Sequence, residues 1–149
     1  MESGGIYIGL GSNLGDRERH ILDALAELTA RGDIRVIACS RLHETEPVGG
    51  PPGQGLFLNA AAELDTELPP RELLARLLEI EARHGRVRTV RNGARTLDLD
   101  LLLYRNQRVA EPDLTIPHPR MWERPFVLVP LSEICSAERL AYWTRAGSR

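Results

Sequence analysis

Hydrophobic residues along the chain follow two different periods, and the change of period marks the expected elements. Four segments have the length and apolar content of β-strands: 6–10, 34–46, 57–64 and 97–104. Between them, apolar residues recur at helical spacing in two sets: Ile21, Leu25 and Leu28, and Leu73, Leu77 and Ile80. The order strand–helix–strand, which occurs twice, predicts an α+β sandwich with helices packed on a mainly antiparallel sheet.

The residues around the first helix indicate where it begins and ends. Ser12 or Asn13 is expected to cap it, with Asp16 in its first turn. Gly32 is expected to end it, because glycine is the usual residue just beyond a helix. The glycine-rich segment 9–15 is interpreted as a strand-to-helix turn, since its spacing differs from that of a dinucleotide-binding fingerprint.

Prolines indicate the start of the later helices. Pro70 opens the second helix, and Pro125 lies in the first turn of a short last helix over 124–134. The Gly- and Pro-rich segment 48–55 can form neither a helix nor a central strand, so we expect a loop there. Asn106 and Gln107 are expected to form a hairpin turn.

Length and charge exclude several classes of protein. We expect the 149 residues to form one domain, 1–149, with 144–149 as a flexible tail. The net charge of −2 indicates neither a nucleic-acid partner nor an anionic membrane surface, and we expect a monomer. All 19 basic residues are arginines, which excludes P-loop, Schiff-base and protein-kinase lysine chemistry. Phosphate, if the protein binds it, must be held by arginine and metal.

The two cysteines indicate a reducing compartment. Cys39 and Cys135 lie far apart in the sequence without a C-x-x-C pair, so we expect isolated thiols. The N-terminal residues lack the basic and apolar regions of a signal peptide, and no apolar stretch approaches membrane-spanning length. We therefore expect a cytoplasmic protein.

The segment 97–104 carries the most informative polar residues. On a strand, Leu97, Leu99, Leu101 and Leu103 are expected on one face, and Asp98 and Asp100 on the other. Two adjacent carboxylates on a strand of the core repel each other, and a divalent cation such as Mg²⁺ would relieve the repulsion. The alternative is an edge strand with two solvated aspartates.

An arginine-rich segment precedes the aspartates. Arg83, Arg86, Arg88, Arg91 and Arg95 lie within thirteen residues that contain no acidic side chain. A basic loop next to a metal-binding carboxylate pair is suited to phosphoryl transfer, because metal and guanidinium groups both stabilise phosphate charge. A solvated basic loop is the alternative.

Six ordered motifs resemble the 6-hydroxymethyl-7,8-dihydropterin pyrophosphokinase family of folate biosynthesis. They are 7–15 (YIGLGSNLG), 44–49 (ETEPVG), 57–60 (FLNA), 85–88 (GRVR), 91–102 (RNGARTLDLDLL) and 115–121 (TIPHPRM). The resemblance implies a ferredoxin-like α+β fold. It also implies transfer of pyrophosphate from ATP to the pterin hydroxymethyl group, with release of AMP. ATP and the pterin are then the partners.

The resemblance also implies roles for individual residues. The predicted catalytic residues are Arg86, Arg95, Asp98 and Asp100, with two Mg²⁺ ions held by Asp98 and Asp100. The predicted pterin-binding residues are Thr45, Pro47, Val48, Phe57, Asn59 and Phe126. The predicted ATP-binding residues are Glu81, Arg88, Leu101, Thr115, His118 and Arg124. Without the resemblance, the two phenylalanines would be interpreted as ordinary core residues, and Asn59 as a structural residue whose amide bonds to the backbone.

Departures from the family pattern concern the nucleotide side. Asn92 and Ala94 stand where many relatives have Trp and Pro, Asp113 where some have Arg, and Pro119 where an aromatic residue is usual. These differences are expected to affect ATP affinity more than chemistry. Two other functions remain open: a glycosyltransferase that uses D-x-D for a metal and a nucleotide sugar, and a binding module without turnover.

Overall fold

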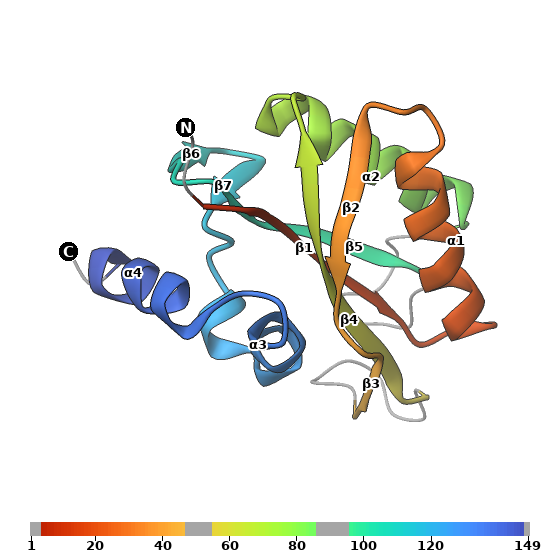
Figure 1. Cartoon of the computed structure of the whole chain (residues 1–149). Helices are drawn as coiled ribbons and strands as arrows, with labels where there is room; N and C mark the ends of the chain where they lie inside the picture. Colours follow the sequence, from red (N-terminus) through yellow and green to blue (C-terminus); the bar gives the residue numbers. More distant parts are fainter. Residues whose placement is uncertain (1–3, 47–54, 86–95, 148–149) are drawn as a thin grey trace.

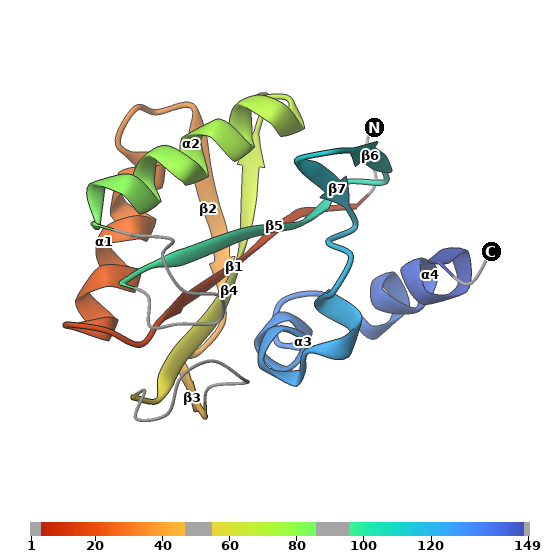
Figure 2. The same cartoon turned by 180° about the vertical axis from the view of Figure 1, so that it is seen from behind.

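The protein is described by a computed structural model over residues 4–46, 55–85 and 96–147. Its strands are β1 (Ile6–Ser12), β2 (Ile34–Cys39), β3 (His43–Thr45), β4 (Phe57–Thr66), β5 (Asp98–Tyr104), β6 (Val109–Glu111) and β7 (Leu114–Ile116). Its helices are α1 (Arg17–Thr29), α2 (Pro70–Arg83), α3 (Pro125–Ser132) and α4 (Ala137–Gly147), with a 3₁₀ turn at Met121–Glu123. Figures 1 and 2 show these elements from opposite sides.

The main sheet is antiparallel, with the strand order β2-β4-β1-β5 and with β3 paired to β4. The units β1-α1-β2 and β4-α2-β5 interleave in this order, which places β1 and β4 in the centre. This topology confirms the predicted α+β, ferredoxin-like sandwich. The smaller sheet, β6 paired to β7, follows β5 in the chain.

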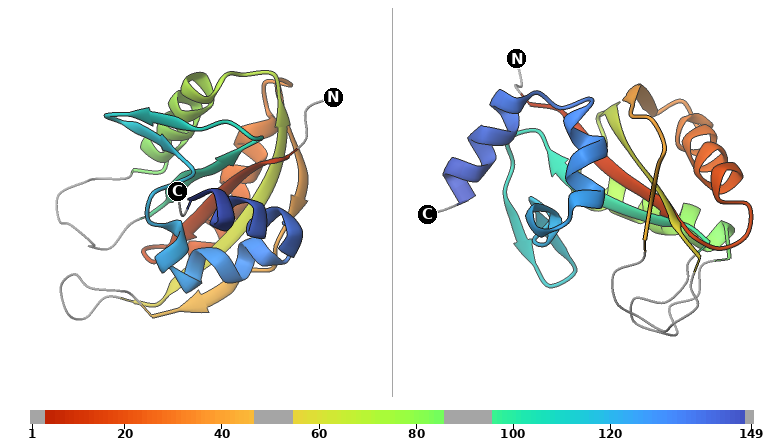
Figure 3. Two further views of the ribbon diagram at one scale, coloured as in Figure 1. Left: turned by 90° about the vertical axis from the view of Figure 1, so that its left-hand side faces the viewer. Right: turned by 90° about the horizontal axis from the view of Figure 1, so that it is seen from below.

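Each face of the main sheet has its own hydrophobic core. On one face, the buried residues of α1 and α2, such as Ile21 and Leu77, pack against Ile6, Ile8 and Leu10 of β1. On the other face, α3 and α4 pack against the sheet through residues that include Val127 and Trp143. In Figure 3, α1 and α4 accordingly lie on opposite sides of the strands.

The first helix begins later than predicted. Asp16 is the cap, because its carboxylate accepts the backbone N–H of Arg19 at 3.2 Å, whereas Ser12 still belongs to β1. The helix ends at Thr29, and Gly32 follows with φ +80°, a conformation that favours glycine. The glycine-rich segment is also mainly strand: of its three glycines, Gly9 and Gly11 belong to β1, and Gly15, with φ +74°, lies in the turn.

The strand expected over 34–46 is interrupted. It divides into β2 and β3 because the chain between them bonds to β4 through Ser40. The backbone N–H of Ser40 donates to the carbonyl of Ala61 at 2.8 Å, and the Ser40 hydroxyl accepts the N–H of Ala61 at 2.9 Å. The other predicted strands and α2 are confirmed in place.

A β-bulge in β5 overturns one part of the predicted alternation. Tyr7 pairs with Leu103 while its neighbour Ile8 pairs with Leu101, so Leu102 is an extra residue in β5. Leu101 remains in the core under α1 and α2, but Leu103 turns to the core under α3 and α4. The prediction for Leu103 was therefore wrong.

The C-terminal part contains elements that the sequence analysis missed. A turn follows β5, with the N–H of Gln107 bonded to the carbonyl of Tyr104 at 3.0 Å, but β6 then pairs with β7 and not with β5. The predicted hairpin from 106–107 was thus wrong. Helix α4 continues to Gly147, so 144–147 are helical where a flexible tail was expected. Residues 148–149 lie outside the described ranges.

Both cysteines are free thiols, as predicted, with Cys39 exposed and Cys135 buried. Within the described ranges, no helix is long and apolar enough to cross a bilayer.

Candidate active site

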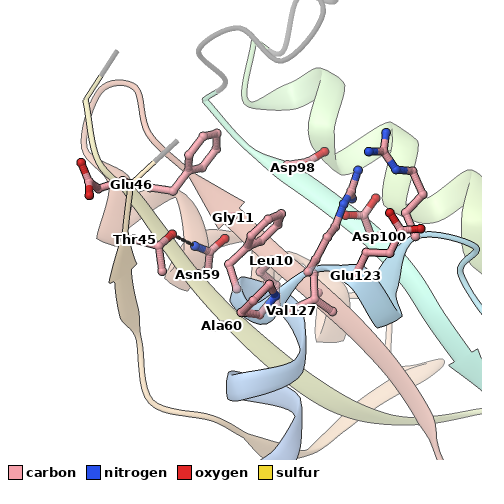
Figure 4. A pocket seen from close by; sticks show the side chains of 16 residues that line it. Leu10, Gly11, Thr45, Glu46, Asn59, Ala60, Asp98, Asp100, Glu123 and Val127 are labelled. Carbon is pink, nitrogen blue, oxygen red and sulfur yellow. Dashed lines mark hydrogen bonds between the residues drawn. The ribbon is translucent and has the colours of Figure 1, made fainter. Parts of the chain in front are cut away.

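A cleft of about 410 Å³ opens between the sheet and the segment that leads into α3. Its lining comprises Gly9, Leu10, Gly11, Thr45, Glu46, Phe57, Asn59, Ala60, Asp98, Asp100, Arg120, Glu123, Arg124, Pro125, Phe126 and Val127. Figure 4 shows that Thr45 and Asn59 lie at one end of the cleft, and Asp98, Asp100 and Glu123 at the other. The cleft therefore has an amide end and a carboxylate end.

Strand register fixes the distance between these two ends. Gly11 of β1 pairs with Asn59 of β4 on one side and with Asp98 of β5 on the other. Directly paired residues present their side chains on the same face, so Asn59 and Asp98 face the cleft across a glycine. Two interstrand spacings separate their backbones by roughly 10 Å. Gly9 stands beside Asp100 in the same way.

The two aspartates fit a divalent cation. Both line the same cleft from alternate positions of β5, as the D-x-D spacing predicted, and both are half-buried. Among the described residues, no group of three or more His, Cys, Asp or Glu side chains is placed to hold a metal alone. Two carboxylates with substrate phosphates as further ligands are a typical Mg²⁺ site.

His118 lies next to the carboxylate end. Its backbone N–H donates to the carbonyl of Leu102 at 2.9 Å, and its Nδ1 accepts the backbone N–H of Arg120 at 3.3 Å. Burial, together with the positive charge of Arg124, lowers the pKa of His118 below its ordinary value. A neutral ring whose Nδ1 accepts carries its proton on Nε2, and this atom lies 3.8 Å from Oδ1 of Asp100.

The amide end brings together four of the residues predicted to bind pterin. Thr45, Phe57, Asn59 and Phe126 all line the cleft. Asn59 is 7% exposed, and its amide donates to the Thr45 hydroxyl at 2.6 Å. The two rings come from different elements, Phe57 from β4 and Phe126 from α3, and an aromatic ligand between them would stack.

Residues predicted to bind ATP are only partly brought to the cleft. Arg124 lines it, with its guanidinium carbon 5.6 Å from the centre of the Phe126 ring, and His118 adjoins Asp100. Leu101 is buried in the core and Thr115 is exposed on β7, so neither is part of the lining. Their ATP-binding roles stay predictions.

Glu81 is not part of the cleft lining and instead makes a structural hydrogen bond. It is 3% exposed near the end of α2, and its carboxylate accepts the backbone N–H of Leu99 at 2.7 Å. Leu99 lies between the two aspartates, so this bond ties α2 to the strand that carries them. ATP binding by Glu81 stays a prediction beside this contact.

The Glu81→Ala variant is expected to unfold more easily, because the buried Leu99 N–H loses its side-chain acceptor. We expect the free energy of unfolding to fall by about 2–3 kcal/mol, as measured by urea denaturation. Glu79→Ala on the exposed side of the same helix is the matched control. Equal denaturation midpoints for the two variants would show that the buried bond contributes little.

Five predicted site residues lie outside the described residues: Pro47, Val48, Arg86, Arg88 and Arg95. Of the departures from the family pattern, Asn92 and Ala94 lie outside the described residues, whereas Pro119 is exposed in a turn. Asp113 accepts two hydrogen bonds from Arg71 of α2 at 3.1 and 2.6 Å. Its carboxylate therefore joins the turn between β6 and β7 to α2.

Sequence reasoning missed several residues of the lining. Gly9 and Gly11 repeat with the same spacing as Asp98 and Asp100, and this shared period of two was the available signal. A Cβ atom on Gly11 would lie 3.0 Å from Oδ1 of Asn59, so the side chain of Asn59 occupies the space that glycine leaves. Glu46 and Arg120 lie within the motifs 44–49 and 115–121 without a predicted role, and no local pattern singled out Glu123.

Comparisons with known proteins identify the family of the chain. A family model for 7,8-dihydro-6-hydroxymethylpterin-pyrophosphokinase matches residues 7–136. The 2-amino-4-hydroxy-6-hydroxymethyldihydropteridine pyrophosphokinase of Bacillus subtilis is 49% identical over 129 residues, which cover 87% of this chain and 77% of the relative. The proteins of the same name from Methylorubrum extorquens and Pseudomonas aeruginosa are 48% and 43% identical over 128 and 135 residues. These alignments cover 86% and 91% of this chain, and 80% and 83% of the relatives. The chain therefore belongs to the 7,8-dihydro-6-hydroxymethylpterin-pyrophosphokinase family.

Proposed function

We propose that the protein transfers pyrophosphate from ATP to the hydroxymethyl group of 6-hydroxymethyl-7,8-dihydropterin and releases AMP, a step of folate biosynthesis. One observation supports this most: a single cleft has an aromatic and amide end beside Asn59 and a carboxylate end at Asp98, separated by Gly11. A flat heterocycle fits the first end and a magnesium triphosphate the second. Gly11 places no side chain of its own between the two ends.

In this reaction the substrate hydroxyl oxygen attacks the β-phosphorus of ATP. A new O–P bond forms, the bond from the β-phosphorus to the oxygen shared with the α-phosphate breaks, and AMP leaves with that electron pair. Asp98 lies at the carboxylate end, across Gly11 from Asn59, and is our candidate for accepting the hydroxyl proton. The pterin end supplies orientation, because a fixed ring keeps the hydroxyl near its target.

Asp98 and Asp100 would hold two Mg²⁺ ions. The ions, when bound, offset the negative charge of the triphosphate and of the departing AMP. Arg124, which lines the cleft, adds a guanidinium on the side of α3, and Arg86 and Arg95 of the arginine-rich segment are proposed to contact phosphate during catalysis.

Product analysis tests this function. The protein is incubated with ATP, Mg²⁺ and 6-hydroxymethyl-7,8-dihydropterin, and the nucleotide product is identified by chromatography. AMP formation is expected. ADP would indicate a simple kinase, and tight pterin binding without any nucleotide product would favour a binding module without turnover.

Gly11→Ala is expected to weaken pterin binding. The new methyl group would push the Asn59 amide by a few tenths of an ångström and disturb its bond to Thr45. We expect the KM for the pterin to rise about tenfold while the KM for ATP changes little, which steady-state kinetics can measure. Gly9→Ala is the control, since its Cβ would meet Leu102 at 3.6 Å, an ordinary contact. A rise in the KM for ATP alone would contradict the assignment of the amide end.

We also infer a monomeric enzyme of the cytoplasm. The two free thiols, Cys39 and Cys135, support a reducing compartment. Size-exclusion chromatography with light scattering tests the monomeric state.

A further inference from the structure

The two walls of the pterin end come from distant parts of the chain. Thr45 and Asn59 belong to β3 and β4, whereas Phe126 belongs to α3. The width of the cleft at this end therefore depends on how α3 sits against β3, and these two elements pack side by side. Strand β3 pairs with β4 along one edge, and within the described residues no strand pairs with its other edge.

Glu133 connects the two walls away from the cleft. It caps the C-terminal end of α3, and its Oε1 accepts the backbone N–H of Arg41 at 2.9 Å. Its Oε2 lies 2.6 Å from Nε2 of His43, and because a carboxylate only accepts, the imidazole must donate. The guanidinium of Arg41 adds a longer bond at 3.4 Å. All these partners belong to β3 or to the residues just before it.

A short path of contacts leads from Glu133 to the cleft. His43 is paired with Asn59 in the register of β3 and β4. Asn59 in turn donates to Thr45, two residues beyond His43. A displacement of His43 would therefore move both polar side chains that line the pterin end.

The Glu133 carboxylate is suited to this contact over a wide pH range. The Arg41 backbone N–H, and secondarily His43, hold the pKa of Glu133 below its ordinary value. The group is therefore ionised at neutral pH and accepts from all its donors. With side chains 22% and 25% exposed, His43 and Glu133 are partly shielded from water, which favours the bond between them.

We propose that Glu133 is a positioning residue for the pterin substrate, which holds β3 against α3 and so sets the spacing between Asn59 and Phe126. This inference rests on the proposed function. Glu133 itself does not line the cleft, so its effect on the substrate passes through His43 and β3.

The test compares Glu133→Ala with two other variants. For Glu133→Ala we expect the KM and the Kd of the pterin to rise about tenfold, with kcat and the KM for ATP within about twofold of wild type. Glu133→Gln retains an acceptor for the Arg41 N–H and is expected to restore most of the pterin affinity. Glu79→Ala is the control: it removes a carboxylate that likewise has two cationic partners, here Arg31 and Arg83, but it lies on α2 and is not part of the cleft lining.

His43→Leu provides a second variant in case Glu133→Ala does not fold. It removes the 2.6 Å bond from the side of β3 and leaves the Arg41 N–H bonded, so a smaller rise of about threefold in the Kd of the pterin is expected. Pterin fluorescence gives this Kd without turnover, and circular dichroism checks the fold.

Two results would overturn the inference: an unchanged pterin Kd in folded Glu133→Ala and His43→Leu, or an equal loss of affinity for ATP and pterin. Failure of the proposed function has a different signature. A wild-type protein that binds the pterin but forms no AMP would contradict pyrophosphoryl transfer, whereas the comparison of Kd values would still decide the role of Glu133.

Discussion

Asp98→Ala and Asp100→Ala are each expected to abolish turnover, with kcat/KM at least about a thousandfold below wild type. A loss of this size corresponds to roughly 4 kcal/mol of transition-state stabilisation. The reason is that both carboxylates line the carboxylate end of the cleft. Removal of either one leaves a single protein carboxylate to bind the magnesium ions of the triphosphate. Pterin binding should be nearly unchanged, because Asn59 and Phe126 are untouched.

The experiment separates metal loss from unfolding. Isothermal titration of Mg²⁺ with a non-hydrolysable ATP analogue measures ion binding, and AMP release measures turnover. Asp65→Ala is the matched control: Asp65 also lies on a strand of the main sheet, but it pairs with Arg35, is half-exposed and is not part of the cleft lining. Near-wild-type turnover in either active-site variant would remove the argument for a metal at these carboxylates.

The aspartate pair could be predicted from sequence because the reason for it is local. Side chains on a strand alternate with a period of two whatever the strand pairs with, so D-x-D places Asp98 and Asp100 on one face. The same rule failed at Leu103, because a bulge depends on how β5 pairs with β1. Pairing between distant segments is not visible in a local pattern.

The amide end of the cleft illustrates the same limit. Asn59 is found among apolar residues of a strand, and by itself it indicates a buried structural amide. Its position across Gly11 from Asp98 follows only from the registers of β4 with β1 and of β1 with β5. The resemblance to a known family identified the residue, and the strand pairing supplied the physical reason for its position.

Helix α4 was missed for a different reason. The segment after Ile134 begins with Cys135 and Ser136, and its helical pattern is short. Its apolar residues, Leu140 and Trp143, contact the core that also contains Val127 of α3. Burial against a neighbouring helix, which a single-segment pattern does not report, stabilises such a helix.

Phe126→Ala is expected to raise the Kd of the pterin by about thirtyfold. The variant would lose one wall of the aromatic end, and with it both the apolar contact area and the preferred stacking of a flat ring. The KM for ATP should change by less than threefold, although Arg124 lies over this ring and loses its neighbour. Fluorescence titration of the pterin and steady-state kinetics with varied ATP measure the two effects separately.

Val129→Ala on the same helix is the control for Phe126→Ala, since Val129 is 50% exposed and lies outside the cleft lining. An unchanged Kd of the pterin in Phe126→Ala would show that the ring is only part of the core. A double variant with Glu133→Ala adds a further test, because residues that act on one contact are not additive. If Glu133 acts by holding Phe126 at its distance from Asn59, the loss in the double variant should be smaller than the product of the single losses. If the loss of pterin affinity in the double variant equals the product of the single losses, the Glu133 carboxylate affects the pterin by a route that does not involve this ring.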